Sequence, residues 1–170
     1  FTPSIAHQIT SVKLLLFRVN TVGTLAIDIK AVDANHKPTG SALCSGTLDC
    51  SGITTSTSGT LYEITLGVGA PLSASTEYAI VATWITGATP NEINWNRRYQ
   101  AALYAGGGRL ESGNSGVAWT FYTTEDHEFE EWGYVPITLT TNAATAISEF
   151  TATFNGAISA DGGEVIDYYG

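Results

Sequence analysis

The stretch of the chain best suited to bind a ligand is NEINWNRRYQ, residues 91–100. Its aromatic rings offer flat apolar faces, while its amide and guanidinium groups offer planar hydrogen-bond donors for sugar hydroxyls and carboxylates. A purely structural interpretation competes, because aromatic side chains dominate protein cores and the arginines could pair with the acidic end of the chain. The candidate ligand-binding residues are Asn94, Trp95, Asn96, Arg97, Arg98 and Tyr99.

A second candidate site is the acidic run EDHEFEE, residues 125–131. Side chains two residues apart in a strand share one face, so Glu128 and Glu130 would lie together, with Asp126 nearby. Calcium is bound by several oxygen ligands, and these three carboxylates could hold a structural calcium ion. The alternative is that a row of acids on an exposed strand prevents pairing with other chains. No other cofactor is expected.

The chain has two cysteines, Cys44 and Cys50, which bracket the segment CSGTLDC. The five intervening residues could form a loop that closes, so a disulfide is expected if the protein folds in an oxidising compartment. Two separately buried free thiols are the alternative. A zinc site is not expected, because only two thiols are present and the three histidines are scattered along the sequence.

The sequence contains no recognisable catalytic pattern. A glycosidase needs two carboxylates that face each other across a cleft, and nothing in the sequence places such a pair. The nucleophile elbow G-x-S-x-G does not occur, and the run AGGGRL lacks the strand, loop and helix that surround a phosphate-binding loop. The sequence therefore predicts a protein that is not an enzyme.

Charge is sparse and unevenly distributed along the chain. Only 14% of the 170 residues are charged, and the net charge is -9. Up to Arg109 there are seven basic and six acidic residues, whereas the remainder has ten acids and no Lys or Arg. An acidic chain repels phosphate backbones, so nucleic acid is not an expected partner. The near-neutral front of one copy could instead meet the acidic end of another.

The pattern of apolar residues predicts an all-β fold. Residues 76–86, TEYAIVATWIT, are apolar on both faces and uncharged after Glu77, which predicts a central strand covered on both sides. Residues 9–19 and 24–33 are predicted to pair antiparallel with one exposed face. Eight or nine short strands with intervening turns predict an antiparallel two-sheet β-sandwich, a jelly roll, over residues 1–135. No apolar run is long enough to span a membrane.

A family resemblance points to the same architecture. The chain resembles the jelly-roll modules of large bacterial surface proteins and phage tail or fibre proteins, often described as choice-of-anchor or carbohydrate-binding-like domains. The resemblance covers roughly residues 5–135 and lies in the segments SVKLLLFRV, GTLAIDIKAVD, HKPTGSALCSG, LYEITLG, LSASTEYAIV and EFEEWG. It rests on spacing and turn patterns, and it implies an extracellular, cell-surface or virion setting.

The last part of the chain, residues 136–170, resembles the opening strands of a fibronectin type III or Ig-like repeat. Phe150, Ala152 and Phe154 alternate there, and ADGG at 160–163 predicts a turn. Two or three strands bury too little surface to offset the loss of chain entropy. This segment is therefore expected to be an incomplete unit, either a linker or a strand exchanged with a neighbour.

Together these features favour a non-catalytic structural or assembly module of an extracellular filament, a cell-surface stalk or a phage fibre. The expected partners are other copies of the chain or neighbouring domains of a longer one. Strand donation to an exposed edge strand would join the copies. The alternative function is a carbohydrate-binding module of an adhesin or a secreted hydrolase, with a glycan bound at residues 94–99.

Overall fold

The computed structural model describes residues 1–20, 23–85, 90–100, 103–160 and 164–169. These residues form strands and one 3-10 turn, which confirms the predicted all-β class. No helix in this described part has the length and apolarity needed to cross a membrane. The elements are β1 (His7–Val19), β2 (Thr24–Val32), β3 (Pro38–Asp49), η1 (Cys50–Gly52), β4 (Thr60–Leu72), β5 (Tyr78–Trp84), β6 (Glu92–Trp95), β7 (Arg97–Arg98), β8 (Arg109–Glu111), β9 (Thr120–Tyr122), β10 (Asp126–His127), β11 (Phe129–Tyr134), β12 (Thr138–Thr145), β13 (Thr153–Ala160) and β14 (Glu164–Tyr169).

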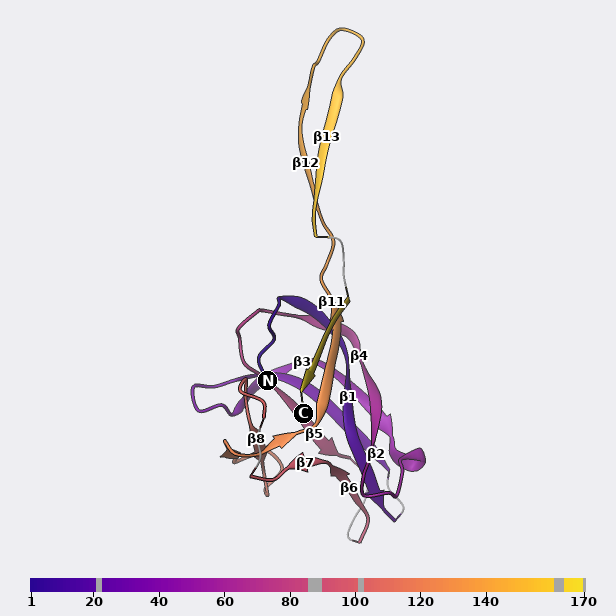
Figure 1. Cartoon of the computed structure of the whole chain (residues 1–170), viewed down its shortest axis with the longest axis vertical. Coiled ribbons are helices and arrows are strands. Elements are labelled where there is room, and N and C mark those ends of the chain that lie inside the picture. Colours follow the sequence, from indigo (N-terminus) through magenta and orange to yellow (C-terminus); the bar gives the residue numbers. More distant parts are fainter. Residues whose placement is uncertain (21–22, 86–89, 101–102, 161–163, 170) are drawn as a thin grey trace.

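Two antiparallel sheets pack against each other and form the body of the molecule (Figure 1). The larger sheet has the strand order β14-β11-β1-β4, and β6 pairs with the end of β1. The smaller sheet has the order β3-β2-β5. Two short pairs, β8 with β9 and β7 with β10, lie beside them. This arrangement confirms the predicted β-sandwich, while the jelly-roll strand order stays a prediction.

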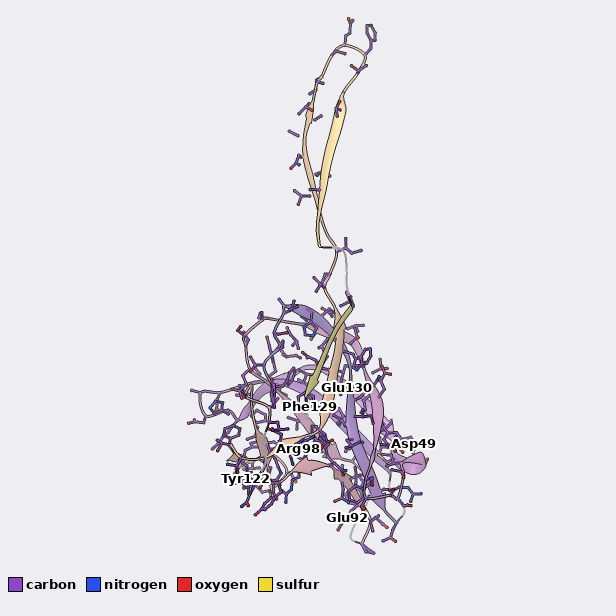
Figure 2. The ribbon with its side chains drawn as sticks, in the orientation of Figure 1. Asp49, Glu92, Arg98, Tyr122, Phe129 and Glu130 are labelled. Atoms are coloured by element: carbon purple, nitrogen blue, oxygen red, sulfur yellow. The ribbon has the colours of Figure 1, made fainter. Side chains whose placement is uncertain are left out.

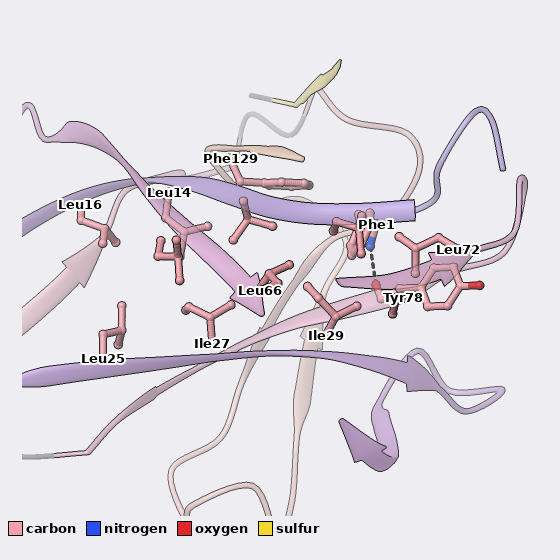
Figure 3. Packing of buried hydrophobic residues seen from close by; sticks show 14 of the residues in the cluster. Phe1, Leu14, Leu16, Leu25, Ile27, Ile29, Leu66, Leu72, Tyr78 and Phe129 are labelled. Carbon is pink, nitrogen blue, oxygen red and sulfur yellow. Dashed lines mark hydrogen bonds between the residues drawn. The ribbon is translucent and has the colours of Figure 1, made fainter. Parts of the chain in front are cut away.

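The core lies between β1 and β2, whose apolar faces oppose each other across the sandwich (Figure 3). Leu14 and Leu16 of β1 are fully buried, and Leu25, Ile27 and Ile29 of β2 are at most 4% exposed. The sequence of β2 alternates these apolar residues with Ala26, Asp28 and Lys30, and the burial of one face agrees with that near-strict alternation. Each buried apolar side chain contributes roughly 1.5–3 kcal/mol when it leaves water, so this pair of facing strands is a main source of stability.

The predicted antiparallel pairing of residues 9–19 with residues 24–33 is wrong. β1 pairs with β4, β11 and β6, whereas β2 pairs with β3 and β5. Each of these strands has one strongly apolar face, and opposing the two faces across the interior removes both from water. If β1 and β2 had paired side by side in one sheet, other strands would have been needed to cover the apolar face of each.

The strand predicted to be central lies at the edge of its sheet. β5 pairs with β2 on one side, and no other described strand pairs with it. Thr86, the last residue of the predicted strand, lies outside the described part of the chain. The apolar pattern was a sound indicator of a strand, but it does not reveal whether a neighbour is present on each side. An uncharged edge is unusual, because exposed edges commonly carry charges or proline.

The predicted disulfide is wrong, because both cysteines are free. Cys44 lies within β3, and Cys50 follows the end of that strand. Six residues of extended strand span roughly 20 Å, whereas a disulfide needs Cα atoms within about 7 Å of each other. Burial raises the pKa of Cys44 to about 11 and also raises the pKa of Cys50, so both thiols stay protonated at neutral pH.

The chain leaves the sandwich after β11 and then returns to it. β12 and β13 pair as a hairpin that extends far from the body (Figure 1), and this hairpin, residues 138–160, is called the arm below. β14 then pairs with β11 along the edge of the larger sheet. The final strand therefore lies in the sheet of its own module. The domain boundary at 135 and the Ig-like resemblance stay predictions, and the predicted turn at 160–163 lies mostly outside the described residues.

The edge strands β3 and β4 meet, although they belong to different sheets. A Cβ atom on Gly46 would lie 2.1 Å from the backbone oxygen of Thr65 and 3.0 Å from Cγ2 of Ile64. The backbone of β3 therefore lies directly against that of β4, and only a residue without a side chain fits there. This contact covers one edge of each sheet.

We expect Gly46→Ala to lower the free energy of unfolding by about 2 kcal/mol or more, because the new methyl group must push two backbones apart. Gly52→Ala is the matched control, since a Cβ atom at Gly52 would meet nothing within 4 Å. Urea denaturation of both variants measures the difference. Equal stabilities for the two variants would contradict the close approach of β3 to β4.

Candidate functional site

A pocket of about 330 Å³ lies between β5 and the segment that carries β8 and β9. Residues 77–82 line one side of it, and residues 108–112 line another. The rings of Trp95, Tyr104 and Trp119 contribute aromatic surface to its wall. A concave site with apolar and aromatic walls and a few polar groups is the usual form of a ligand pocket in proteins.

Trp95 is fixed in the wall of this pocket by its own contacts. It lies at the end of β6 opposite Leu16 of β1, and its ring packs against the core. The indole Nε1 donates a hydrogen bond to the backbone oxygen of Glu128, at 2.8 Å. One ring face stacks on His127, with 4.3 Å between the ring centroids and 17° between the planes. These contacts already use the polar edge and one face of the ring.

His127 is held in its neutral form. Burial, reinforced by the nearby charges of Arg109 and Arg97, lowers the pKa of His127 to about 4. Its Nδ1 lies 3.2 Å from the backbone oxygen of Asn96. An imidazole with so low a pKa is a weak base at neutral pH, so the geometry gives His127 a packing role rather than that of a proton acceptor.

Asp126 organises the part of the wall that carries Tyr104. The Asp126 side chain is buried, and its Oδ2 accepts hydrogen bonds from the backbone N–H groups of Leu103, at 2.8 Å, and Tyr104, at 2.9 Å. The hydroxyl of Tyr104 accepts a hydrogen bond from the backbone N–H of Thr2, at 2.7 Å. The carboxylate thus connects the loop before β8 to the beginning of the chain.

A buried carboxylate shared by two arginines holds the same region together. Glu125 is 5% exposed, and its Oε2 accepts hydrogen bonds from Arg97 Nη1, at 3.0 Å, and Arg109 Nη1, at 3.1 Å. Arg98, labelled in Figure 2, forms an ion pair with Glu128 at 3.5 Å. These ion pairs join β7 and β8 to the acidic run, as the structural interpretation of residues 91–100 requires.

The structure does not bring the six candidate sugar-binding residues together. Trp95 is the one that lines the pocket. The others are placed as follows: Asn94 in β6 opposite Phe17, Arg97 and Arg98 in β7 with their glutamate partners, Asn96 donating to two backbone oxygens of the loop before β4, and Tyr99 exposed. Sugar binding at residues 94–99 stays a prediction from the sequence.

The three candidate calcium ligands have separate partners. Asp126 binds backbone N–H groups, and Glu128 pairs with Arg98. Glu130 lies 3.7 Å from Lys13 Nζ and accepts a hydrogen bond from Trp132 Nε1 at 2.8 Å. Within the described part of the chain, no group of three or more His, Cys, Asp or Glu side chains is placed to hold a metal ion. Calcium binding stays a prediction.

Several residues that shape the pocket could not be identified from the sequence. Tyr104 reaches it through a contact with Thr2, which is 102 positions away. His36 stacks on Phe121, with 4.7 Å between the ring centroids, and its Nδ1 lies 2.7 Å from Glu77 Oε2. Contacts between such distant turns leave no periodic pattern, so local spacing could not have revealed them.

We expect the stability of the protein to fall as the pH is lowered from about 6.5 to about 4, because the unfolded chain gains a proton on His127 in that range while the folded chain does not. The share due to His127 should be about 2–3 kcal/mol. Denaturation curves of the wild type and of His127→Phe at pH 7 and pH 4.5 measure it. The variant should lose less stability, and equal losses would contradict the assignment.

No protein-family model matches this chain, and no curated protein or solved structure is significantly similar to it.

Proposed function

We propose that this chain is a non-catalytic assembly module of an extracellular filament, a cell-surface stalk or a phage fibre, and that copies join through the arm. The observation that carries the proposal is the arm itself. A hairpin of two strands, each eight residues long, extends from the sandwich into solvent (Figure 1). Among the described strands, β12 and β13 are hydrogen-bonded to each other and to no strand of the sandwich, so we infer that the arm contacts another copy.

The surface of the arm fits this role. Ile147 is 72% exposed and Phe150 is 88% exposed, both near the tip. In Figure 2 the side chains drawn along the arm stand clear of the body. Between residues 136 and 160 the sequence contains one charged residue, Glu149. A hairpin of two strands is marginally stable in water by itself, so an arm with a single charge and exposed apolar residues gains most from a partner.

The polar groups of the pocket favour assembly over catalysis or sugar recognition. Asp126 and Glu125 are engaged in holding backbone and arginine groups, and His127 is a weak base packed on an indole. The aromatic ring expected to stack on a sugar, Trp95, is stacked on His127 instead. These groups hold the segment between β6 and β11 in place, which supports a structural module more than a binding or catalytic one.

We expect wild-type protein to associate with rising concentration, and a variant with a shortened arm to stay monomeric. Leu139 and Ile158 are partners in the backbone register of the hairpin, so replacing residues 140–157 by the turn Asn-Gly is designed to keep a short hairpin and to leave β14 in place. Analytical ultracentrifugation over a wide concentration range measures the mass of each species.

Thr141→Ser is the matched control, because it changes an exposed arm residue without altering the length of the hairpin. It should associate as the wild type does. A wild-type protein that remains monomeric at the highest concentrations, or a shortened variant that associates equally well, would refute assembly through the arm.

A further inference from the structure

The free edge of β5 is chemically unlike a protected edge. β5 is an edge strand of the smaller sheet that pairs with β2 alone, and its sequence, YAIVATW, contains no charge and no proline. Val81 is only half-buried, and Ala82 and Thr83 are exposed. Natural proteins usually protect such edges with charges, proline or a covering segment. The composition is that of a strand with a neighbour on both sides.

The backbone of β5 alternates between its partner and this free edge. Ile85 donates its N–H to the backbone oxygen of Thr24 at 2.9 Å. The backbone N–H and C=O groups of the odd-numbered residues of β5 therefore point toward β2. Tyr78 exchanges two backbone hydrogen bonds with Phe1, at 2.7 and 2.6 Å. The backbone N–H and C=O groups of the even-numbered residues therefore point away from β2, toward the free edge. The contact with Phe1 shows that the backbone of this edge pairs at one residue with another part of the chain (Figure 3).

Beyond Tyr78 the outward groups belong to Ile80, Ala82 and Trp84. Among the described residues, no other backbone segment is bonded to them. The indole Nε1 of Trp84 is also buried without a hydrogen-bond acceptor in the described part of the chain. Buried donors are nearly always paired in native proteins, so an unpaired indole N–H is unusual in a strand whose outward backbone groups also lack partners in the described residues.

Two pockets with shared lining residues lie beside β5, and together they are called the β5 groove below. The pocket of about 330 Å³ is lined by residues 77–82, and a second pocket of about 490 Å³ is lined by residues 81–84. Both are also lined by Pro38, Ser112 and Trp119. Every residue of β5 therefore lines one of the two pockets, and an added strand would need open space along this length.

We propose that the β5 groove binds one strand of the arm of a second copy, which adds to the smaller sheet next to β5. This inference rests on the proposed function and names the surface that receives the arm. The arm fits as occupant because β12 and β13 are eight residues each, against seven in β5, and neither strand contains a charged residue. Its exposed backbone edges supply the donors and acceptors that Ile80 and Ala82 lack.

The contact is head to tail, because the arm and the groove are different surfaces of the same chain. Such heterologous contacts produce open filaments unless the rotation between copies closes a ring. The arm and the groove can therefore be tested separately, in two variants of the chain. A donor keeps its arm but has a blocked groove, and an acceptor keeps its groove but has the shortened arm.

Ala82→Pro blocks the groove in the donor, because proline removes an N–H that faces outward and leaves the hydrogen bonds to β2 intact. Ala82→Lys is a second blocking variant, which keeps the N–H but places a charge at the exposed edge. Ala82→Ser is the control, since it keeps both the N–H and the small size. Thermal denaturation of each variant verifies that it is folded.

We expect donor and acceptor to sediment as monomers when alone and as a one-to-one dimer when mixed, with the amides of Ile80 and Ala82 exchanging at least tenfold more slowly in the mixture. Ala82→Ser should associate as the wild type does. If both blocking variants associate like the wild type, or the mixture stays monomeric while the wild type associates, the β5 groove is not the acceptor although the arm still joins copies. If the wild type is monomeric, the proposed function itself fails.

Discussion

The opposition of the apolar faces of β1 and β2 is the interaction on which the rest of the structure depends. Burial of these faces brings two sheets together. Neither sheet closes on itself, so each has two edge strands. The edges are then treated in different ways. β3 lies against β4 through Gly46, and β14 covers β11. β5 and β14 are edges that no further described strand pairs with, and the uncharged β5 is the one that motivates the assembly proposal.

A network of ion pairs and stacked rings fixes the segment between β6 and β11, which contains only very short strands. Glu125 is shared by two arginines, Asp126 binds two backbone N–H groups, and His127 stacks on Trp95. Breaking a buried ion pair leaves an uncompensated charge, which is costly. These groups therefore position the wall of the pocket that faces β5.

Local patterns in the sequence predicted the elements, but not their neighbours. The alternation of Leu25, Ile27 and Ile29 identified a strand with one buried face, since strand periodicity is a local property. Whether that face would lie across the core from β1 or beside it depends on the whole topology. The same limit applies to Cys44, whose nearness to Cys50 in sequence ceases to matter once the intervening chain is extended. Nor did the sequence place Tyr104 beside Thr2, because such contacts have no period.

In the proposed assembly, the free energy needed to order the arm would be offset by hydrogen bonds formed in the groove. The arm has few contacts that hold it in shape, and part of the favourable energy of docking would be used to fix it, which lowers the affinity of a single contact. The groove offers unpaired backbone groups in compensation, and hydrogen bonds shielded from water are stronger than exposed ones. A single junction would then be weak and reversible. A row of junctions would be stable, because each interior copy in a filament is held on both sides, through its arm and through its groove.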